Sequence, residues 1–507
     1  MSDSPAQRYR HPAGVYLVSA TEMWERFSYY GITALLVLYL TAPVVADGFG
    51  WSAPEAIRLY GLYAGLAFAA PAFGGWVSSS VLGERRCILW GGAAIMLGHV
   101  LLGGPAYLPA LLGAFSGVPV EEVLRQSALV QGRLLLDSAQ REGLRLALLN
   151  VTGSDANLGA VSAAYVLRSW SFFGGLALVI VGTALIKPTI SSIMGKLYAP
   201  DDPKRVFGFT LFMMGVWTGS FCANFVAGSL GERFGWHLGF MAAAVGMAIG
   251  LGAYAALQRK LLANIGERPD HTGSMRTWFA RFTRLTPAEK HRLRVLAMLS
   301  AFTVVYGIAF YQKAGFIHLL VRESVVRDIG GFEVPAAWFL SISTGGFLLF
   351  APMVSYVMAR ARRQPDAAQC LVMGLASLAC GYVIFLLAAT WAADANGMLS
   401  MAWIVAAYLC FGLGDVFIWP PQLAAVTALA PASMTSFIVG LWYVTVGAGA
   451  YGAGLVGAWA RETGTQTGFT VLLVMLVVAT LLAFALRRWM TVRPASWSRS
   501  DLQGVDS

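Results

Sequence analysis

Two carboxylates and a guanidinium stand close together in an otherwise apolar stretch near the start of the chain. Glu22, Glu25 and Arg26 lie within five positions, and Tyr29 and Thr33 follow them at helical spacing. The i, i+3, i+4, i+7 spacing places all five side chains on one face of a helix. Each ionisable group in hydrocarbon costs about 2.5–3.5 kcal/mol on insertion scales. This face must therefore meet protein or water rather than lipid.

The chemistry that such a face could carry is reversible proton binding. Arg26 stabilises the ionised forms of Glu22 and Glu25, whereas the loss of water favours their protonated forms. A carboxylate that is ion-paired in one conformation and exposed in another couples its proton to the motion. The alternative is a structural ion pair that only holds helices together. Three ionisable groups followed by two tyrosines favour proton coupling.

The whole chain has the composition of a polytopic membrane protein. It has 507 residues, of which 57% are hydrophobic and 12% charged, with a mean hydropathy of +0.64. Soluble proteins carry about 25% charged residues. The net charge of +10 predicts no nucleic-acid partner, because the basic residues gather in particular loops. The five cysteines form no C-x-x-C pair and no nucleophile–base arrangement stands out, so we expect no metal, cofactor or enzymatic activity.

Twelve segments are apolar enough to cross a bilayer, which requires about 20 apolar residues. They lie near residues 14–42, 54–80, 87–112, 169–196, 206–230, 236–258, 293–321, 335–359, 367–392, 400–429, 434–460 and 468–488. The predicted fold class is an all-α membrane protein with 12 transmembrane helices in two six-helix bundles, the major-facilitator fold.

Loop charges predict how the helices are oriented. Lys and Arg gather in the loops on the side of the amino terminus, and the opposite short loops are acidic or balanced. The positive-inside rule places both termini in the cytoplasm, and we expect a multi-pass protein of a bacterial inner membrane in contact with its lipid. The predicted regions are a cytoplasmic amino terminus (1–13), an amino-terminal bundle (14–258) with an outer insertion (113–168), a basic cytoplasmic linker (259–292), a carboxyl-terminal bundle (293–489) and a cytoplasmic tail (490–507).

The insertion at 113–168 is the one long connection in this plan. Two amphipathic helices, at 120–139 and 142–151, and a turn at 153–157 are predicted within it. Loops of this length are usually functional or disordered. We interpret it either as a packed outer cap without a role in transport or as a surface that binds a partner.

Several motifs resemble those of a known family. The first-helix residues resemble the signature of proton-dependent oligopeptide transporters, the POT or PTR2 branch of the major facilitator superfamily, in the pattern Glu22-x-x-Glu25-Arg26-Phe27-x-Tyr29-Tyr30. The stretch 182–198 resembles the fourth helix of that family, and 414–442 resembles its tenth and eleventh helices. The resemblance covers nearly the whole chain apart from the insertion.

The resemblance implies a transporter whose two bundles rock around a central cavity. In the family the acidic pair and the arginine of the first helix handle protons, which assigns that role to Glu22, Glu25 and Arg26. A lysine of the fourth helix meets them across the site, and a carboxylate of the tenth helix receives the substrate's amino group. Those two roles fall on Lys187 and Asp415. Each is also an isolated ionisable group in an apolar segment, which favours a functional position over a snorkelling or structural one.

Other positions depart from the family pattern. Thr33 replaces an arginine, and a threonine cannot hold a carboxylate in a bidentate fork. Trp217 replaces an asparagine and fills volume where an amide could pair with peptide backbone. The carboxylate expected before Gln312 is Tyr311, a cation follows at Lys313, and the Asn-Pro of the eighth helix reads Ser343-Thr344.

The loss of the seventh-helix carboxylate leaves Lys187 without its usual partner. It then either pairs with Glu22 or Glu25 or meets the substrate directly. The predicted substrate-binding residues are Tyr29, Tyr30, Thr33, Tyr63, Lys187, Trp217, Tyr311, Gln312, Ser343, Asp415 and Trp442.

These observations favour a proton-coupled symporter that imports small peptides or peptide-like compounds by alternating access. Because the peptide-clamping positions are altered, a second hypothesis keeps the fold and the proton coupling but changes the substrate. It would be a modified peptide, a peptide-like metabolite or another anion. A third hypothesis is a membrane scaffold or sensor that uses the insertion to bind a partner.

Overall fold

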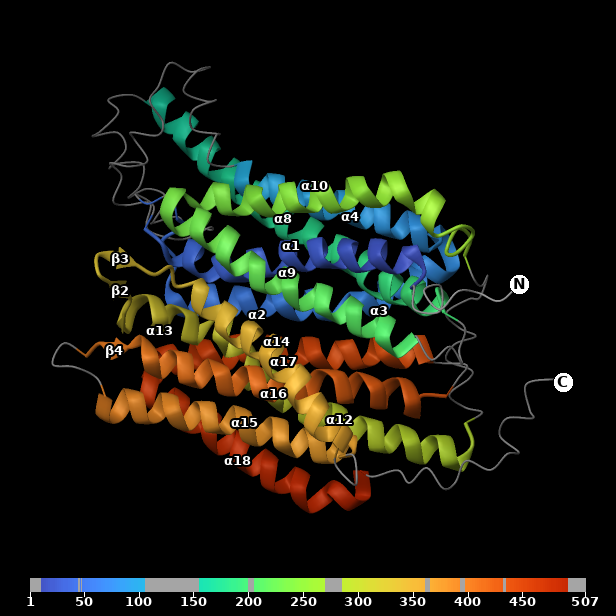
Figure 1. Cartoon of the computed structure of the whole chain (residues 1–507). Coiled ribbons are helices and arrows are strands. Elements are labelled where there is room, and N and C mark those ends of the chain that lie inside the picture. The colour runs from blue at the N-terminus through green and yellow to red at the C-terminus, as the bar shows by residue number, and fades with distance from the viewer. Residues whose placement is uncertain are drawn as a thin grey trace.

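The computed structural model describes residues 11–43, 46, 48–104, 155–198, 205–269, 285–360, 365–392, 397–431 and 435–490. In this part of the chain helices dominate (Figure 1). The first half contains α1 (Ala13–Thr41), α2 (Ala53–Ala69), α3 (Pro71–Val77), the π-helical turn η2 (Ser78–Leu82), α4 (Glu84–Gly103), α8 (Asp155–Lys196), α9 (Arg205–Phe234) and α10 (Trp236–Leu261). Because α2, α3 and η2 follow one another without a loop, they form one crossing, and this half has six.

The second half repeats the plan with six more crossings. It contains α12 (Pro287–Phe310), the 3-10 turn η4 (Tyr311–Ala314), α13 (Phe316–Ser324), α14 (Trp338–Arg360), α15 (Ala367–Leu387), η5 (Ala388–Ala392), α16 (Met401–Leu429), α17 (Thr435–Thr463) and α18 (Thr465–Met490). Two small sheets join the helix ends. β1 (Val325–Val326) pairs in parallel with β4 (Leu399–Ser400), and β2 (Asp328–Ile329) pairs antiparallel with β3 (Phe332–Glu333).

The predicted spans agree with these helices, and the fold class is confirmed. Eleven helices of the described part are long and apolar enough to cross a membrane. The twelfth, α1, is absent from that group, and it is the helix that carries Glu22, Glu25 and Arg26. One local prediction was wrong. The turn at 153–157 overlaps α8, which is helical from Asp155, and the rest of the insertion up to residue 154 lies outside the described residues.

The helices form two bundles that pack along one another (Figure 1). Within the first, α1 contacts α9 and α10, and α4 packs on α8; within the second, α15 contacts α16 and α18. The main contact between the bundles joins α2 to α17. A Cβ atom at Gly61 would lie only 2.5 Å from the Cα of Gly454, so glycine is required where these helices cross.

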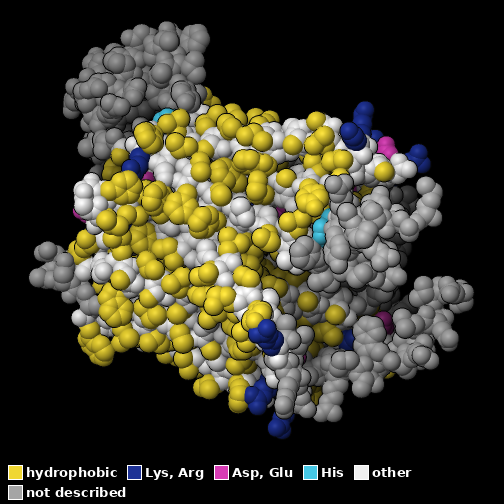
Figure 2. Space-filling model, viewed as in Figure 1, with side chains coloured by type: hydrophobic (Ala, Val, Ile, Leu, Met, Phe, Trp, Pro, Cys, Tyr) yellow, Lys and Arg dark blue, Asp and Glu magenta, His cyan; other side chains and the backbone are white. Residues whose placement is uncertain are grey.

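The two ends of the bundle differ. We call the end where α1 begins and α18 ends the proximal face, and the end with the four strands the distal face (Figure 1). Between them, hydrophobic side chains cover most of the described surface in Figure 2, and charged side chains are few. An apolar band of this kind suits contact with lipid chains.

The seventh crossing is broken in its middle. Its first part, α12, ends at Phe310, η4 tightens the chain for four residues, and α13 starts after Gly315. Gln312 and Lys313 on this turn are both buried, with 1% and 8% of their surfaces exposed. The break thus places two polar side chains inside the protein rather than against lipid.

Candidate functional site

The first group of charged residues lies entirely on α1, and we call Glu22, Glu25 and Arg26 the helix-one cluster. Arg26 Nε lies 3.1 Å from Glu22 Oε1, and the same guanidinium contacts the carboxylate of Glu25. At most 4% of any of the three residues is exposed. Thr183 of α8 donates a 3.4 Å hydrogen bond to Glu25 Oε1. One cation therefore serves two buried carboxylates, as the helical spacing predicted.

Lys187 of α8 lies among aromatic rings. Its Nζ is 3.6 Å from the ring centroid of Phe68 and 4.7 Å from that of Tyr443, which belongs to the other half. Within the described residues it forms no ion pair, although Glu22 and Glu25 are near enough to interact with it electrostatically. The suggested pairing of Lys187 with either glutamate is therefore not made in this structure. Aromatic faces stabilise a cation only partly, so Lys187 is available to an anion.

The second group of charged residues is assembled from three helices, and we call Lys313, Ser343 and Asp415 the second-half cluster. Asp415 Oδ1 accepts hydrogen bonds from Tyr306 at 2.7 Å and from Trp419 Nε1 at 3.0 Å. Its Oδ2 lies 4.0 Å from Lys313 Nζ, which donates to Ser343 Oγ at 3.3 Å. Asp415 has no exposed surface. A carboxylate expected to receive a substrate amino group thus already has a lysine beside it.

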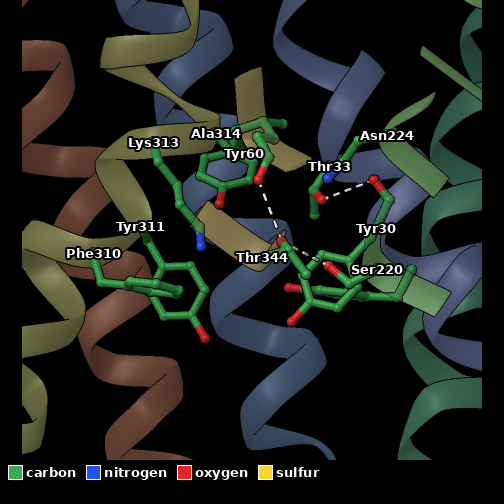
Figure 3. Close-up of a pocket in the computed structure, with 12 residues that line it drawn as sticks. Tyr30, Thr33, Tyr60, Ser220, Asn224, Phe310, Tyr311, Lys313, Ala314 and Thr344 are labelled. Atoms are coloured by element: carbon green, nitrogen blue, oxygen red, sulfur yellow. Dashed lines mark hydrogen bonds between the residues drawn. The ribbon is translucent and has the colours of Figure 1, made fainter. Parts of the chain in front are cut away.

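A small pocket lies between the two halves, near the break in the seventh crossing (Figure 3). In Figure 3 the Lys313 side chain extends into the middle of the group. The lining consists mainly of hydroxyl groups and aromatic rings. The residues are Tyr29, Tyr30, Thr33, Tyr60, Ser220, Asn224, Phe310, Tyr311, Lys313, Ala314, Leu340 and Thr344. Ser220 of α9 and Thr344 of α14 bring their hydroxyl oxygens within 3.4 Å of each other and join the halves beside the pocket.

Four of the predicted binding residues line this pocket, namely Tyr29, Tyr30, Thr33 and Tyr311. Thr33 donates to the carbonyl of Tyr30 within its own helix at 3.0 Å. Seven others do not line it. These are Tyr63, Lys187, Trp217, Gln312, Ser343, Asp415 and Trp442.

Several of those seven have partners that explain their positions. Trp217 stacks on Phe347 across the two halves, with centroids 4.1 Å apart. Gln312 donates to the carbonyl groups of Ile308 and Ala453, each at 3.0 Å. In this conformation Trp217 packs the two halves together, Gln312 joins two helices of the second half, and neither lines the pocket.

Sequence reasoning missed part of the lining. Lys313 was noticed as a departure from the family pattern but was not assigned to the site. A lone lysine in an apolar segment could have identified it. Tyr60, Ser220, Asn224 and Thr344 gave no comparable signal, because small polar and aromatic side chains are common in membrane helices for packing.

Polar contacts between the halves close the distal face. The carboxylate of Glu232 accepts hydrogen bonds from the backbone N–H groups of Ala336 and Ala337, at 3.0 and 2.8 Å. Arg233 donates to the carbonyl of Glu333 at 2.7 Å, and Arg58 pairs with Glu462 at 2.7 Å. These contacts hold the two halves together at the distal face.

Comparison with known proteins identifies the family of this chain. The model of the POT family, PTR2, matches residues 85–261 and 270–472. The chain is 27% identical to the peptide transporter YePEPT of Yersinia enterocolitica, covering 89% of each protein. It is 26% identical to the uncharacterized transporter YclF of Bacillus subtilis, covering 94% of this chain and 93% of that one.

Solved structures show the same fold. A mutant of the peptide transporter POT bound to sulfate superposes with a TM-score of 0.76 at 23% identity, over 95% of this chain and 96% of that one. A POT family transporter bound to 5-aminolevulinic acid superposes with a TM-score of 0.76 at 21% identity, over 96% of this chain and 98% of that one. The family model matches well over half of the sequence, and the chain belongs to the POT family of the major facilitator superfamily.

Proposed function

We propose that this protein is a proton-coupled symporter that imports small peptides or peptide-like compounds by alternating access. The observation that carries the proposal is the helix-one cluster, in which two buried carboxylates share one guanidinium. Relatives over most of the chain are described as a peptide transporter and a di-/tripeptide transporter. They favour peptide transport over a changed substrate (a modified peptide, a peptide-like metabolite or another anion) and over the membrane scaffold or sensor.

Charge balance gives the cluster a way to couple proton and substrate. Glu22 and Glu25 are balanced by Arg26 and Lys187 on the same half of the molecule. A proton on either carboxylate leaves one positive charge in excess, and a substrate carboxylate can then neutralise it. A buried charge is costly, so the loaded site favours binding of proton and substrate together.

Alternating access then exposes the site to each face in turn. The bonds of Glu232, Arg233 and Arg58 with the second half close the distal face in this structure. During import, these bonds break so that substrate and proton can enter from the distal face, and they then form again. Release follows at the proximal face when the proton leaves.

The remaining assignments follow the same proposal. The protein acts by transport rather than catalysis, in the lipid of a bacterial inner membrane, with both termini in the cytoplasm. Two bundles, at 14–258 and 293–489, move about a linker at 259–292. The substrate site comprises the pocket lining together with the predicted residues that surround it, among them Lys187 and Asp415.

The substitution Glu25→Gln tests the function. Proteoliposomes with an inside-alkaline pH gradient should lose accumulation of a labelled dipeptide, because the neutral amide cannot carry the proton. Counterflow of labelled against unlabelled dipeptide should remain, since it needs no net proton transfer. Full pH-driven accumulation by this variant would contradict the proposal. Glu267→Gln, at an exposed glutamate, is the matched control.

A further inference from the structure

We infer that the substrate site selects small carboxylate anions and does not require a free amino group, because Lys313 holds the place of that group beside Asp415. The inference rests on the proposed transport function and names its substrate class. It would include peptides whose amino terminus is acylated. The residue that sets this choice is Lys313.

The first support is the charge of the pocket. Among its twelve lining residues Lys313 is the charged one, and no carboxylate lines it. The ammonium group of a peptide needs an anion or several acceptors when it leaves water. Asp415 has no exposed surface, and its Oδ2 lies 4.0 Å from Lys313 Nζ. An incoming amino group would have to displace a covalently attached cation.

The second support is the hydrogen bonding of Asp415 and Lys313. Asp415 Oδ1 already accepts from Tyr306 and Trp419, and Oδ2 faces Lys313 at 4.0 Å without a hydrogen bond. Lys313 Nζ has three protons to donate, and one goes to Ser343. The same ammonium group lies 3.6 Å from the ring centroid of Phe310, which also lines the pocket. The pair therefore presents a donor, not an acceptor, to the pocket.

The third support is a pair of polar groups in the pocket lining, on Tyr29 and Asn224. The hydroxyl of Tyr29 and Oδ1 of Asn224 are buried and have no hydrogen-bond partner among the described residues. Tyr29 can donate to a carboxylate oxygen, and Asn224 can pair with an amide of the same ligand. An N-acylated peptide offers both groups. Thr33 and Ser220 add hydroxyls that either donate or accept.

The fourth support is the overall charge. Across the two clusters and Lys187, three cations balance three carboxylates. One bound proton leaves a single positive charge, and a monoanion cancels it. A zwitterionic peptide brings no net charge and leaves the excess uncompensated. Symport of one proton with one monoanion is therefore the electroneutral cycle.

The test compares dialanine with N-acetyl-dialanine, in which a neutral acetamide replaces the amino cation. Binding of each to the purified full-length protein is measured by titration calorimetry. The wild type should bind the acetylated peptide at least as tightly as the free one. Lys313→Gln should shift the ratio of the two binding affinities toward the free peptide by about tenfold or more, because Asp415 becomes available to the amino group.

Two further variants locate the effect. Lys313→Arg keeps the cation and should keep the wild-type ratio. The double substitution Lys313→Gln with Asp415→Asn should lose the increase in relative affinity for the free peptide, because position 415 then offers no carboxylate to the amino group. Wild-type binding of the free peptide alone would overturn the inference. The wild-type ratio decides even if a variant fails to fold.

Uptake separates this inference from the proposed function. In proteoliposomes with a pH gradient, accumulation of the acetylated peptide should be unchanged by a potassium-diffusion potential. Accumulation of free dialanine by Lys313→Gln should rise when the interior is made negative. Binding of the acetylated peptide without uptake of either peptide would refute transport but support the substrate class. A potential that drives the acetylated peptide would overturn the electroneutral cycle.

Discussion

The two charged clusters solve the problem of buried charge in different ways. The helix-one cluster places two carboxylates and one guanidinium on adjacent turns of α1, so one carboxylate is in excess on this helix and the balancing cation, Lys187, lies on α8. The second-half cluster brings Lys313, Ser343 and Asp415 from three crossings, and its one cation balances its one anion. A carboxylate in excess favours binding of a proton, whereas in the second-half cluster the lysine already accompanies the carboxylate and a second cation beside it is disfavoured. The difference separates proton binding from substrate choice.

Removal of the shared cation should have the largest effect on this contrast. Arg26→Gln leaves Glu22 and Glu25 buried without a cation on their own helix. Loss of one partner from a buried pair costs about 3–5 kcal/mol, so we expect a strong fall in thermal unfolding temperature and no pH-driven uptake. Arg26→Lys should retain part of the stability and part of the uptake, because the cation remains. The loss is partial because an ammonium group cannot contact two carboxylates as a guanidinium does. Equal behaviour of the two variants would show that geometry is unimportant in the helix-one cluster.

Removal of the second-half carboxylate should have a smaller effect. Asp415→Asn keeps the acceptor for Tyr306 and Trp419 but leaves Lys313 without its anion. We expect a loss of about 2 kcal/mol in the free energy of unfolding, measured by thermal unfolding in detergent. Adding Lys313→Gln should recover part of it, since the uncompensated cation is then gone. A double variant less stable than the sum of the two single changes would contradict the pairing.

The helix-one cluster was predictable from sequence because its contacts are local. Residues four positions apart on a helix must be neighbours, so Glu22 and Arg26 could be paired without any tertiary information. The twelve crossings were predictable for a similar reason, since hydropathy is a property of each segment alone. The start of α8 was not predictable in this way. Residues 155–157 were predicted as part of a turn, but they are helical because α8 extends further than a membrane crossing requires.

The second-half cluster could not be predicted because it depends on long-range packing. Lys313 and Asp415 are about 100 positions apart, and only the break between α12 and α13 turns the lysine inward. The resemblance to transporters assigned Asp415 to a substrate amino group but gave no indication of a lysine beside it. The orientation of Lys187 toward Phe68 and Tyr443, rather than a glutamate, likewise required the fold.

Thr183 bonds to the helix-one cluster and Ser343 belongs to the second-half cluster, and these two hydroxyls give a matched comparison. Thr183→Val removes the hydrogen bond to Glu25, and Ser343→Ala removes the one from Lys313. Each should cost about 1 kcal/mol of unfolding free energy. The valine variant should change the pH dependence of uptake, and the alanine variant should change the ratio of acetylated to free peptide bound. If the valine variant instead changed the peptide ratio and the alanine variant changed the pH dependence, the assigned roles of the two clusters would be contradicted.

Removal of an exposed ion pair at the distal face should have the smallest effect on stability and uptake. Arg58 and Glu462 bridge the halves at the distal face, with about half of each side chain exposed, at 50% and 49%. Exposed pairs contribute about 0–1 kcal/mol, so Arg58→Gln should change the unfolding temperature little and uptake less than about twofold. A larger loss of uptake, measured at the same protein density, would show that this pair contributes more to distal closure than its exposure predicts.

The most direct measurement of the central claim is proton movement driven by substrate. Proteoliposomes containing the full chain and a pH-sensitive dye inside receive a dipeptide outside, with no imposed gradient. Wild-type protein should acidify the interior as peptide enters, and Glu25→Gln should not. Peptide entry without acidification by the wild type, or equal acidification by the variant, would contradict the assignment of proton coupling to the helix-one cluster.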